Sequence, residues 1–109
     1  MNIETKDDIV IINLNSFSND ISRKLNELVS NYENKNVIVN LNYLLSVERQ
    51  PVDLLTKLSM IHKENKQSFI IISQSLSIEN EQLDIVPTLQ EAYDYIEMEN
   101  IERDLGIDF

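Results

Sequence analysis

The chain of 109 residues contains no cysteine, one glycine and one histidine. Without cysteine it has no disulfide framework, no thiol nucleophile and no cysteine-ligated metal site. Loops that wrap a phosphate need several glycines, so the single Gly106 excludes a Walker loop, a dinucleotide fingerprint and a glycine-rich kinase loop. The single histidine, His62, excludes a histidine-cluster metal site. Since these absences exclude most enzyme classes, we expect a protein that is not an enzyme and that holds no cofactor or metal.

Long apolar runs are also absent. No run approaches the roughly 20 residues that are needed to cross a bilayer, and residues 1–8 are charged and lack the apolar core of a signal peptide. We therefore expect a soluble cytoplasmic protein. Its hydrophobic content of 42% is ordinary for a globular protein. A chain of this length buries a sizeable core, so we expect one domain over residues 1–109.

Charge is distributed unevenly along the chain. Residues 1–78 carry 9 acidic and 8 basic side chains, whereas residues 79–109 carry 10 acidic side chains and Arg103 as their only base. Almost all of the net charge of −10 therefore lies near the C-terminal end. Such a chain is repelled by nucleic acid and by anionic lipid headgroups, so we expect neither as a partner. Two interpretations of the acidic end stay open: a solvated helix that aids solubility, or a docking surface for a basic partner.

The segment 37–73 predicts a strand, a helix and a second strand. Residues 37–41 and 68–73 are short, apolar and mostly β-branched, which is typical of strands buried on both faces. Residues 51–66 between them have the pattern of an amphipathic helix, with Pro51 in its first turn, where a missing N–H costs nothing. This spacing predicts two parallel strands joined by a right-handed crossover. The helix residues expected to face the core are Leu54, Leu55, Leu58 and Ile61.

The first part of the chain predicts a hairpin and a helix. Residues 9–14 have the composition of a strand, with which residues 1–5 pair as a short edge hairpin. The polar run 15–20 offers N-cap candidates for a helix. Apolar residues then recur at the spacing i, i+4, i+7, i+8 and i+11, which is one helix face. The residues on this face are Ile21, Leu25, Leu28, Val29 and Tyr32.

The last part predicts a short strand and a final helix. Residues 83–86 form the strand, and Thr88 and Glu91 have the spacing of a capping box. Beyond Met98 the apolar pattern changes phase, which indicates a bend or a less tightly docked helix end. The buried face of this helix should consist of Leu89, Ala92, Tyr93 and Ile96. The whole chain thus predicts an α/β fold: one sheet of about four to five strands, with helices packed on it.

With these elements in the order β-β-α-β-α-β-β-α, the chain resembles the STAS domain, the small fold of bacterial anti-sigma-factor antagonists. The resemblance covers roughly residues 8–98, and residues 99–109 are an acidic extension of the last helix. It rests on the element order, on the gapless spacing of the central crossover, and on a last strand that enters its helix through residues 84–92.

The resemblance implies a lost phosphorylation switch. In the family, the strand before the central helix leads to an Asp-Ser-Ser-Gly turn whose second serine is phosphorylated by the partner anti-sigma kinase. Aligned without gaps, this chain has Glu48, Arg49, Gln50 and Pro51 at those positions. The alignment thus keeps a residue, Gln50, at the position of the phosphorylated serine. Gln50 has no hydroxyl group, so it cannot accept a phosphate.

The resemblance also implies a partner-binding surface, because STAS domains bind partners around this turn and along the following helix. The candidate residues here are Glu48, Arg49, Gln50, Asp53 and Lys57. Residues 49–67 carry 4 bases and 2 acids, which suits an acidic partner. We expect a non-enzymatic regulatory protein-interaction module whose partner is an anti-sigma factor or another regulator. The alternatives are a STAS-like scaffold or homodimeric subunit unconnected to sigma-factor control and, more remotely, a small-ligand binder.

Other residues carry weaker signals. Arg49 lies beside a helix N-terminus, where its charge favours the binding of an anion. The alternative is that Arg49 only forms a solvent-exposed ion pair with Glu48 or Asp53. His62 is expected at the surface or boundary of the central helix. Ser46 is the nearest hydroxyl that could replace the phosphoacceptor, on proximity alone. The acid pairs of the final helix, Asp94 with Glu97 and Glu99 with Glu102, are expected to form a hydrated face.

Overall fold

The computed structural model describes residues 1–16, 18–44, 49–74 and 83–106, with the backbone alone for residues 49–51. Within these ranges the elements follow the expected order. They are β1 (Asn2–Lys6), β2 (Ile9–Asn13), α1 (Asn19–Asn31), β3 (Asn36–Asn40), α2 (Arg49–Glu64), β4 (Phe69–Ile72), β5 (Asp84–Val86) and α3 (Leu89–Asp104). The predicted α/β fold is confirmed.

The strands form one mixed sheet in the order β1-β2-β3-β4-β5. β1 pairs with β2 as an antiparallel hairpin, which confirms the predicted edge hairpin. β2, β3, β4 and β5 are parallel to one another. In the register of β3 and β4, Val37 lies opposite Phe69 and Asn40 lies opposite Ile72, so the predicted parallel crossover is also confirmed.

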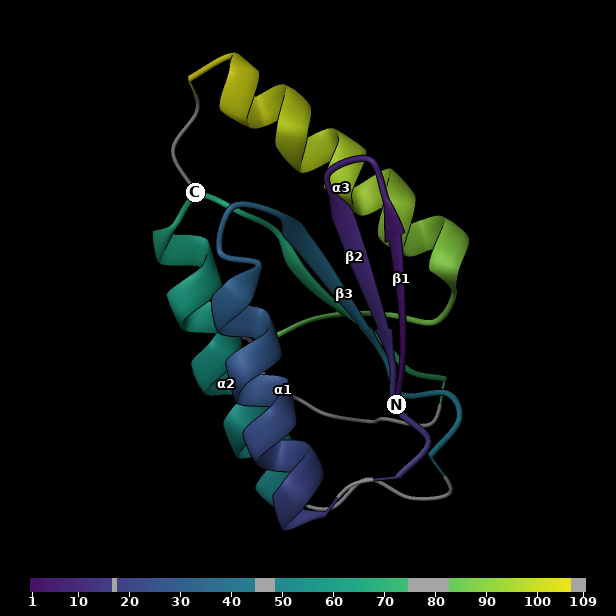
Figure 1. Ribbon diagram of the computed structural model, residues 1–109. Helices are drawn as coiled ribbons and strands as arrows, with labels where there is room; N and C mark the ends of the chain where they lie inside the picture. The colour runs from purple at the N-terminus through teal and green to yellow at the C-terminus, as the bar shows by residue number, and fades with distance from the viewer. Residues whose placement is uncertain (17, 45–48, 75–82, 107–109) are drawn as a thin grey trace.

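The helices cover both faces of the sheet. α1 and α2 lie on one face and α3 lies on the other (Figure 1). Because side chains alternate along a strand, β3 supplies both cores: Val37 and Val39 pack under α1 and α2, while Ile38 packs under α3. This two-sided burial explains why the central strands have nearly continuous β-branched sequences.

α1 begins as the polar run predicted. Ser18 is its N-cap, and the Ser18 hydroxyl accepts a hydrogen bond of 3.3 Å from the backbone N–H of Ile21. Leu25 and Val29 are buried, and the other predicted apolar residues of this face pack partly buried against the same core. The predicted face of the first helix is therefore confirmed.

The phase of α2 differs from the prediction at one position. Leu55 and Leu58 are buried as expected, but Ile61 is 46% exposed and His62 is 1% exposed. The predicted core position of Ile61 and the predicted surface position of His62 are both wrong. The physical reason lies in the partners of His62, which come from other elements and are described below.

α3 begins at the predicted cap, because the backbone N–H of Glu91 donates to the Thr88 hydroxyl at 3.2 Å. Ala92 and Ile96 are buried, but Leu89 is 38% exposed, so its predicted core position is wrong. The helix continues unbroken to Asp104. Ile101 and Leu105 are exposed, so the apolar residues that follow the change of phase lie on the solvent side of the helix, in keeping with the less tightly docked end that was one of the two predicted alternatives.

Candidate functional site

The parallel strands end at a polar edge of the sheet, where ligands of open α/β sheets commonly bind. Asn13 ends β2 and Asn40 ends β3. Asn40 Nδ2 donates to Asn13 Oδ1 at 3.1 Å, and Asn13 Nδ2 donates to Glu4 Oε2 at 3.3 Å. A chain of amide and carboxylate groups thus runs from the centre of this edge to β1. We call it the carboxyl edge.

The turn after β3 is anchored by hydrogen bonds of Asn42 to β3 itself and to two other segments. The backbone N–H of Asn42 donates to Asn40 Oδ1 at 3.0 Å, and Asn42 Oδ1 accepts from the backbone N–H of Gln74 at 2.9 Å. Asn42 Nδ2 also donates to the carbonyl of Pro87 at 3.4 Å. This one side chain therefore links the turn to the segments that follow β4 and β5.

Tyr43 lies on this anchored turn and is 63% exposed. Together with Met1, Leu89 and the asparagines of the carboxyl edge, it lines an open hollow of about 500 Å³. An exposed aromatic side chain on an anchored turn, beside polar groups, is typical of a protein-binding surface, since tyrosine is enriched among the residues that dominate interface energies. Sequence reasoning missed Tyr43, because a single aromatic residue in a loop gives no periodic signal.

The structure describes only some of the predicted partner-binding residues. Glu48 and the alternative acceptor Ser46 lie outside the described residues. Arg49 and Gln50 begin α2, and their side chains are not described. Asp53 and Lys57 are exposed on the same helix, one turn apart, as a partner-binding role requires. The partner-binding assignment of these residues stays a prediction.

His62 is a structural residue. Its Nε2 contacts the carbonyl oxygen of Lys35, and since a carbonyl only accepts, Nε2 carries the hydrogen. The ring meets Phe69 edge to face, with centroids 5.9 Å apart. Burial lowers the pKa of His62, although the hydrogen bond to Lys35 and the charge of Glu33 oppose that shift.

A second polar cluster lies at the opposite, amino-terminal edge of the sheet. Lys63 Nζ lies 3.0 Å from Asp84 Oδ2, and the Tyr95 hydroxyl donates to Asp84 Oδ1 at 3.0 Å. Burial and the nearby charge of Asp84 raise the pKa of Tyr95. With Glu99 and Arg103 these residues line a hollow of about 360 Å³.

Glu99 departs from the predicted hydrated face. Its Oε1 atom is enclosed and lacks a hydrogen-bond partner. Burial raises the pKa of its carboxyl group, while a hydrogen bond from Ser68 partly opposes the rise. Asp94 and Glu97 are exposed as expected. The assignment of Glu99 to a hydrated face is therefore wrong, because α3 turns this position toward the sheet.

Two classes of feature are absent from the described part of the chain. It contains no group of three or more histidine, cysteine, aspartate or glutamate side chains that could hold a metal ion. Among the same residues, no helix is both long and apolar enough to span a membrane.

Comparison with known proteins gives information on the fold alone. Neither a protein-family model nor a curated protein matches the chain. Among solved structures, the chain is similar to the NMR structure of the protein TM1081, with a TM-score of 0.62 and 15% sequence identity over 87% of this chain and 86% of that one. At this identity the likeness supports the α/β architecture and says nothing of activity.

Proposed function

We propose that this protein is a non-enzymatic, cytoplasmic regulatory module of the STAS type, similar to an anti-sigma-factor antagonist without its phosphorylation switch. Its partner binds across the carboxyl edge and the first half of α2. The observation that carries the proposal is the exposure of Tyr43 on a turn anchored by Asn42, between β3 and the helix that presents Asp53 and Lys57.

The fold supports this proposal in three ways. The element order and the parallel β3–α2–β4 crossover are those that the resemblance implies. The first turn of α2 begins at Arg49, so the position of the lost phosphoacceptor, Gln50, lies at the N-terminal end of that helix. Residues 49–67 carry two more bases than acids in an otherwise acidic protein, which favours an acidic partner surface.

The absence of a hydroxyl at Gln50 determines the kind of regulation. Phosphorylation adds about −1.5 to −2 charge at pH 7 and repels a partner that binds the unmodified turn. Because Gln50 is neutral and has no hydroxyl, the surface stays permanently in its binding state. Binding is then controlled by the abundance of the protein and its partner.

A crosslinking pulldown from the native cell, read by mass spectrometry, tests the proposal. Recovery of an anti-sigma factor, with crosslinks to α2, supports it. Tyr43→Ala and Lys57→Glu should each weaken that complex at least about tenfold, the loss of a typical interface anchor. Lys24→Glu, an equally exposed charge reversal on α1, is the matched control and should leave binding unchanged.

Three results would count against the proposal. Recovery of the protein only with itself, as a stable homodimer, would favour the scaffold alternative. Binding of a recovered regulator that is insensitive to Tyr43→Ala and Lys57→Glu would place the interface elsewhere. Equal loss of binding in the Lys24→Glu variant would show a general charge effect.

A further inference from the structure

The outer side of α3 carries an apolar stripe. Met98, Ile101 and Leu105 are 61%, 54% and 71% exposed. They follow one another at i, i+3 and i+7, the spacing of residues on one helix face. The backbone N–H of Leu105 donates to the carbonyl of Ile101 at 3.0 Å, so Leu105 continues the helical path beyond the last helical residue.

This stripe is separate from the buried side of the same helix. Ala92 and Ile96 are fully buried against the sheet. At about 100° per residue, Met98, Ile101 and Leu105 lie about half a turn around the helix from them. α3 thus has two apolar sides, one packed in the core and one facing solvent. Core packing explains the first side and leaves the second unexplained.

Carboxylates flank the stripe. Asp94 and Glu97 precede Met98 and Ile101 by one helical turn, and both are exposed. Asp104, also exposed, follows Ile101 by three residues. These spacings place acidic groups directly beside the apolar side chains.

The only base in residues 79–109 is Arg103, and its side chain makes hydrogen bonds toward the sheet. Arg103 Nη2 donates inward to Ser68 Oγ at 3.0 Å and to Asn36 Oδ1 at 3.3 Å. Residues 79–109 contain no other lysine or arginine. The exposed side of α3 is therefore apolar in its centre and has carboxylates at its margins. A base from another element, Lys6 of β1, lies over the ring of Tyr93 at 5.0 Å, near the start of the helix.

We propose that the outer face of α3, centred on Met98, Ile101 and Leu105, docks a basic amphipathic helix of a partner protein. The apolar anchors of such a helix cover the stripe, and its flanking lysines or arginines pair with Asp94, Glu97 and Asp104. A second copy of this face carries the same acidic margins, so charge repulsion disfavours self-association. The stripe spans about 10 Å of helix, enough for about two turns of a partner helix.

This surface is independent of the one under Proposed function. α3 covers the opposite face of the sheet from α1 and α2 (Figure 1). Failure of either proposal therefore leaves the other standing.

The test uses the full chain and a labelled model peptide with leucines at helical spacing i, i+3, i+4 and i+7 and lysines on its flanks. Fluorescence anisotropy gives the affinity, and backbone NMR shifts locate the binding site. A scrambled peptide of the same composition and a peptide with glutamate in place of lysine are the peptide controls. We expect the amphipathic basic peptide to shift α3 resonances and to bind at least about tenfold more tightly than either control.

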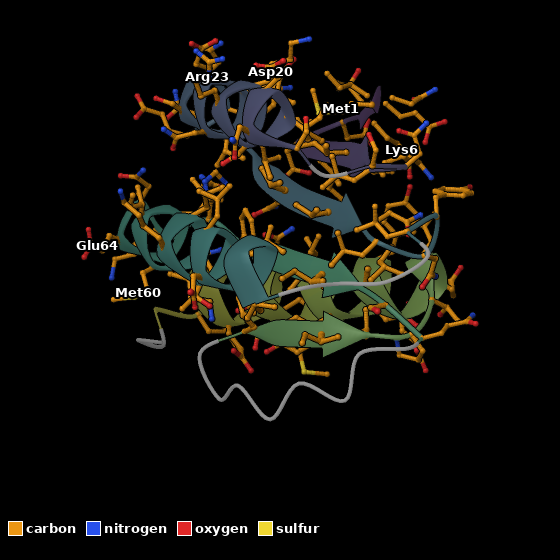
Figure 2. All side chains as sticks on the ribbon, turned by 90° about the horizontal axis from the view of Figure 1, so that it is seen from below. Met1, Lys6, Asp20, Arg23, Met60 and Glu64 are labelled. Atoms are coloured by element: carbon orange, nitrogen blue, oxygen red, sulfur yellow. The ribbon has the colours of Figure 1, made fainter. Side chains whose placement is uncertain are left out.

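Matched protein variants localise the effect. Met98→Ser with Ile101→Ser should weaken the basic peptide at least about tenfold. Met60→Ser with Ile61→Ser is the control, because these two apolar residues on α2 are similarly exposed, at 52% and 46%. Their exposed charged neighbours on the helix are of both signs, Lys57, Lys63 and Glu64, rather than acidic alone. Figure 2 shows Met60 at the outer side of α2, away from the sheet. Asp94→Asn with Glu97→Gln should weaken binding and reduce its dependence on salt.

Four outcomes would overturn the proposal. The first is equal binding of the scrambled peptide, which indicates charge attraction alone. The second is NMR shifts confined to other elements. The third is the same loss of affinity in the α2 control variant. The fourth is a dimer in sedimentation that dissociates on Met98→Ser with Ile101→Ser, which would assign the face to a second copy.

Discussion

Arg103 on α3 donates a hydrogen bond of 3.3 Å to the side-chain oxygen of Asn36 at the start of β3. The same oxygen accepts the backbone N–H of Ser68 at 2.8 Å, and the amide nitrogen of Asn36 donates to Asp8 at 3.2 Å. Asn36 is 1% exposed. One buried amide thus joins the hairpin, the approach to β4 and the last helix.

Asn36→Ala should lower the free energy of unfolding by about 1–3 kcal/mol, because it leaves the buried N–H of Ser68 without an acceptor. Urea melts measure this change. Asn34→Ala, an exposed asparagine in the preceding turn, is the control and should change stability by less than about 0.5 kcal/mol. Equal effects of the two substitutions would mean that Asn36 is not a structural link.

Leu58→Ala should cost about 2–5 kcal/mol, because Leu58 is 3% exposed and lies between α2 and the sheet. Met60→Ala, two residues along the same helix and 52% exposed, should cost less than about 0.5 kcal/mol. Chemical denaturation of both variants provides the comparison. A Leu58→Ala cost below about 1 kcal/mol would contradict the packing described here.

His62 should titrate below its ordinary pKa of 6.5, because burial disfavours the charged imidazole. It is the only histidine, so its imidazole resonances are unambiguous in an NMR titration. Since the folded state binds this proton less tightly than the unfolded state, His62 lowers stability as the pH falls through 6.5 toward its folded pKa. A midpoint above 6.5 would contradict the burial of the ring.

Glu99→Gln should stabilise the protein at neutral pH. Burial raises the pKa of Glu99 above 4.5, so the folded state holds this proton more tightly than the unfolded state does. The wild-type protein therefore loses stability as the pH rises through the folded pKa of Glu99. The glutamine variant has no such loss, because glutamine does not titrate. Urea melts at about pH 8 and about pH 5 should show a larger gain for the variant at the higher pH. Glu97→Gln, on the exposed side of α3, is the control.

The lost switch predicts that the protein gains no phosphate between Ser46 and Thr56 when it is mixed with ATP and a cognate anti-sigma kinase. Thr56 donates its hydroxyl to the carbonyl of Val52 at 2.8 Å, inside the helix, which opposes its use as an acceptor. Replacing Arg49 and Gln50 with serine and Pro51 with glycine restores the family turn and should allow phosphorylation where the kinase docks. Phosphopeptide mass spectrometry reads both results, and phosphate on wild-type Ser46 or Thr56 would contradict the prediction.

The framework of the fold was predictable because it depends on local patterns. Residues 37–41 are rich in β-branched side chains, and Leu25 and Val29 have helical spacing. Both patterns predict which side chains are buried, whichever element packs against them. His62 shows where this reasoning stops. Hydrophobicity favours Ile61 for the core, but the carbonyl of Lys35 and the ring of Phe69 reach His62 from elements distant in the sequence.

The candidate sites were less predictable for the same reason. The exposure of Tyr43 depends on an anchor through Asn42 to segments after β4 and β5. Glu99 is enclosed because α3 faces Ser68 and Asp84, which no spacing within the helix reveals. Charge counting located the acidic end, yet only the structure shows that Arg103 donates inward, to Asn36 and Ser68.

The two-sided burial of β4 has a consequence for synthesis on the ribosome. Ile70 and Ile72 face α3, whereas Phe69 and Ile71 face α1 and α2. The helices on one side are made before β4, and the helix on the other side is made after it. At about 5–20 residues per second, the nascent chain holds an isoleucine-rich strand uncovered on one face for seconds, until α3 has left the exit tunnel. A ribosome paused between β4 and α3 would therefore expose an apolar surface and an unpaired strand edge, the features that make incomplete chains prone to aggregation.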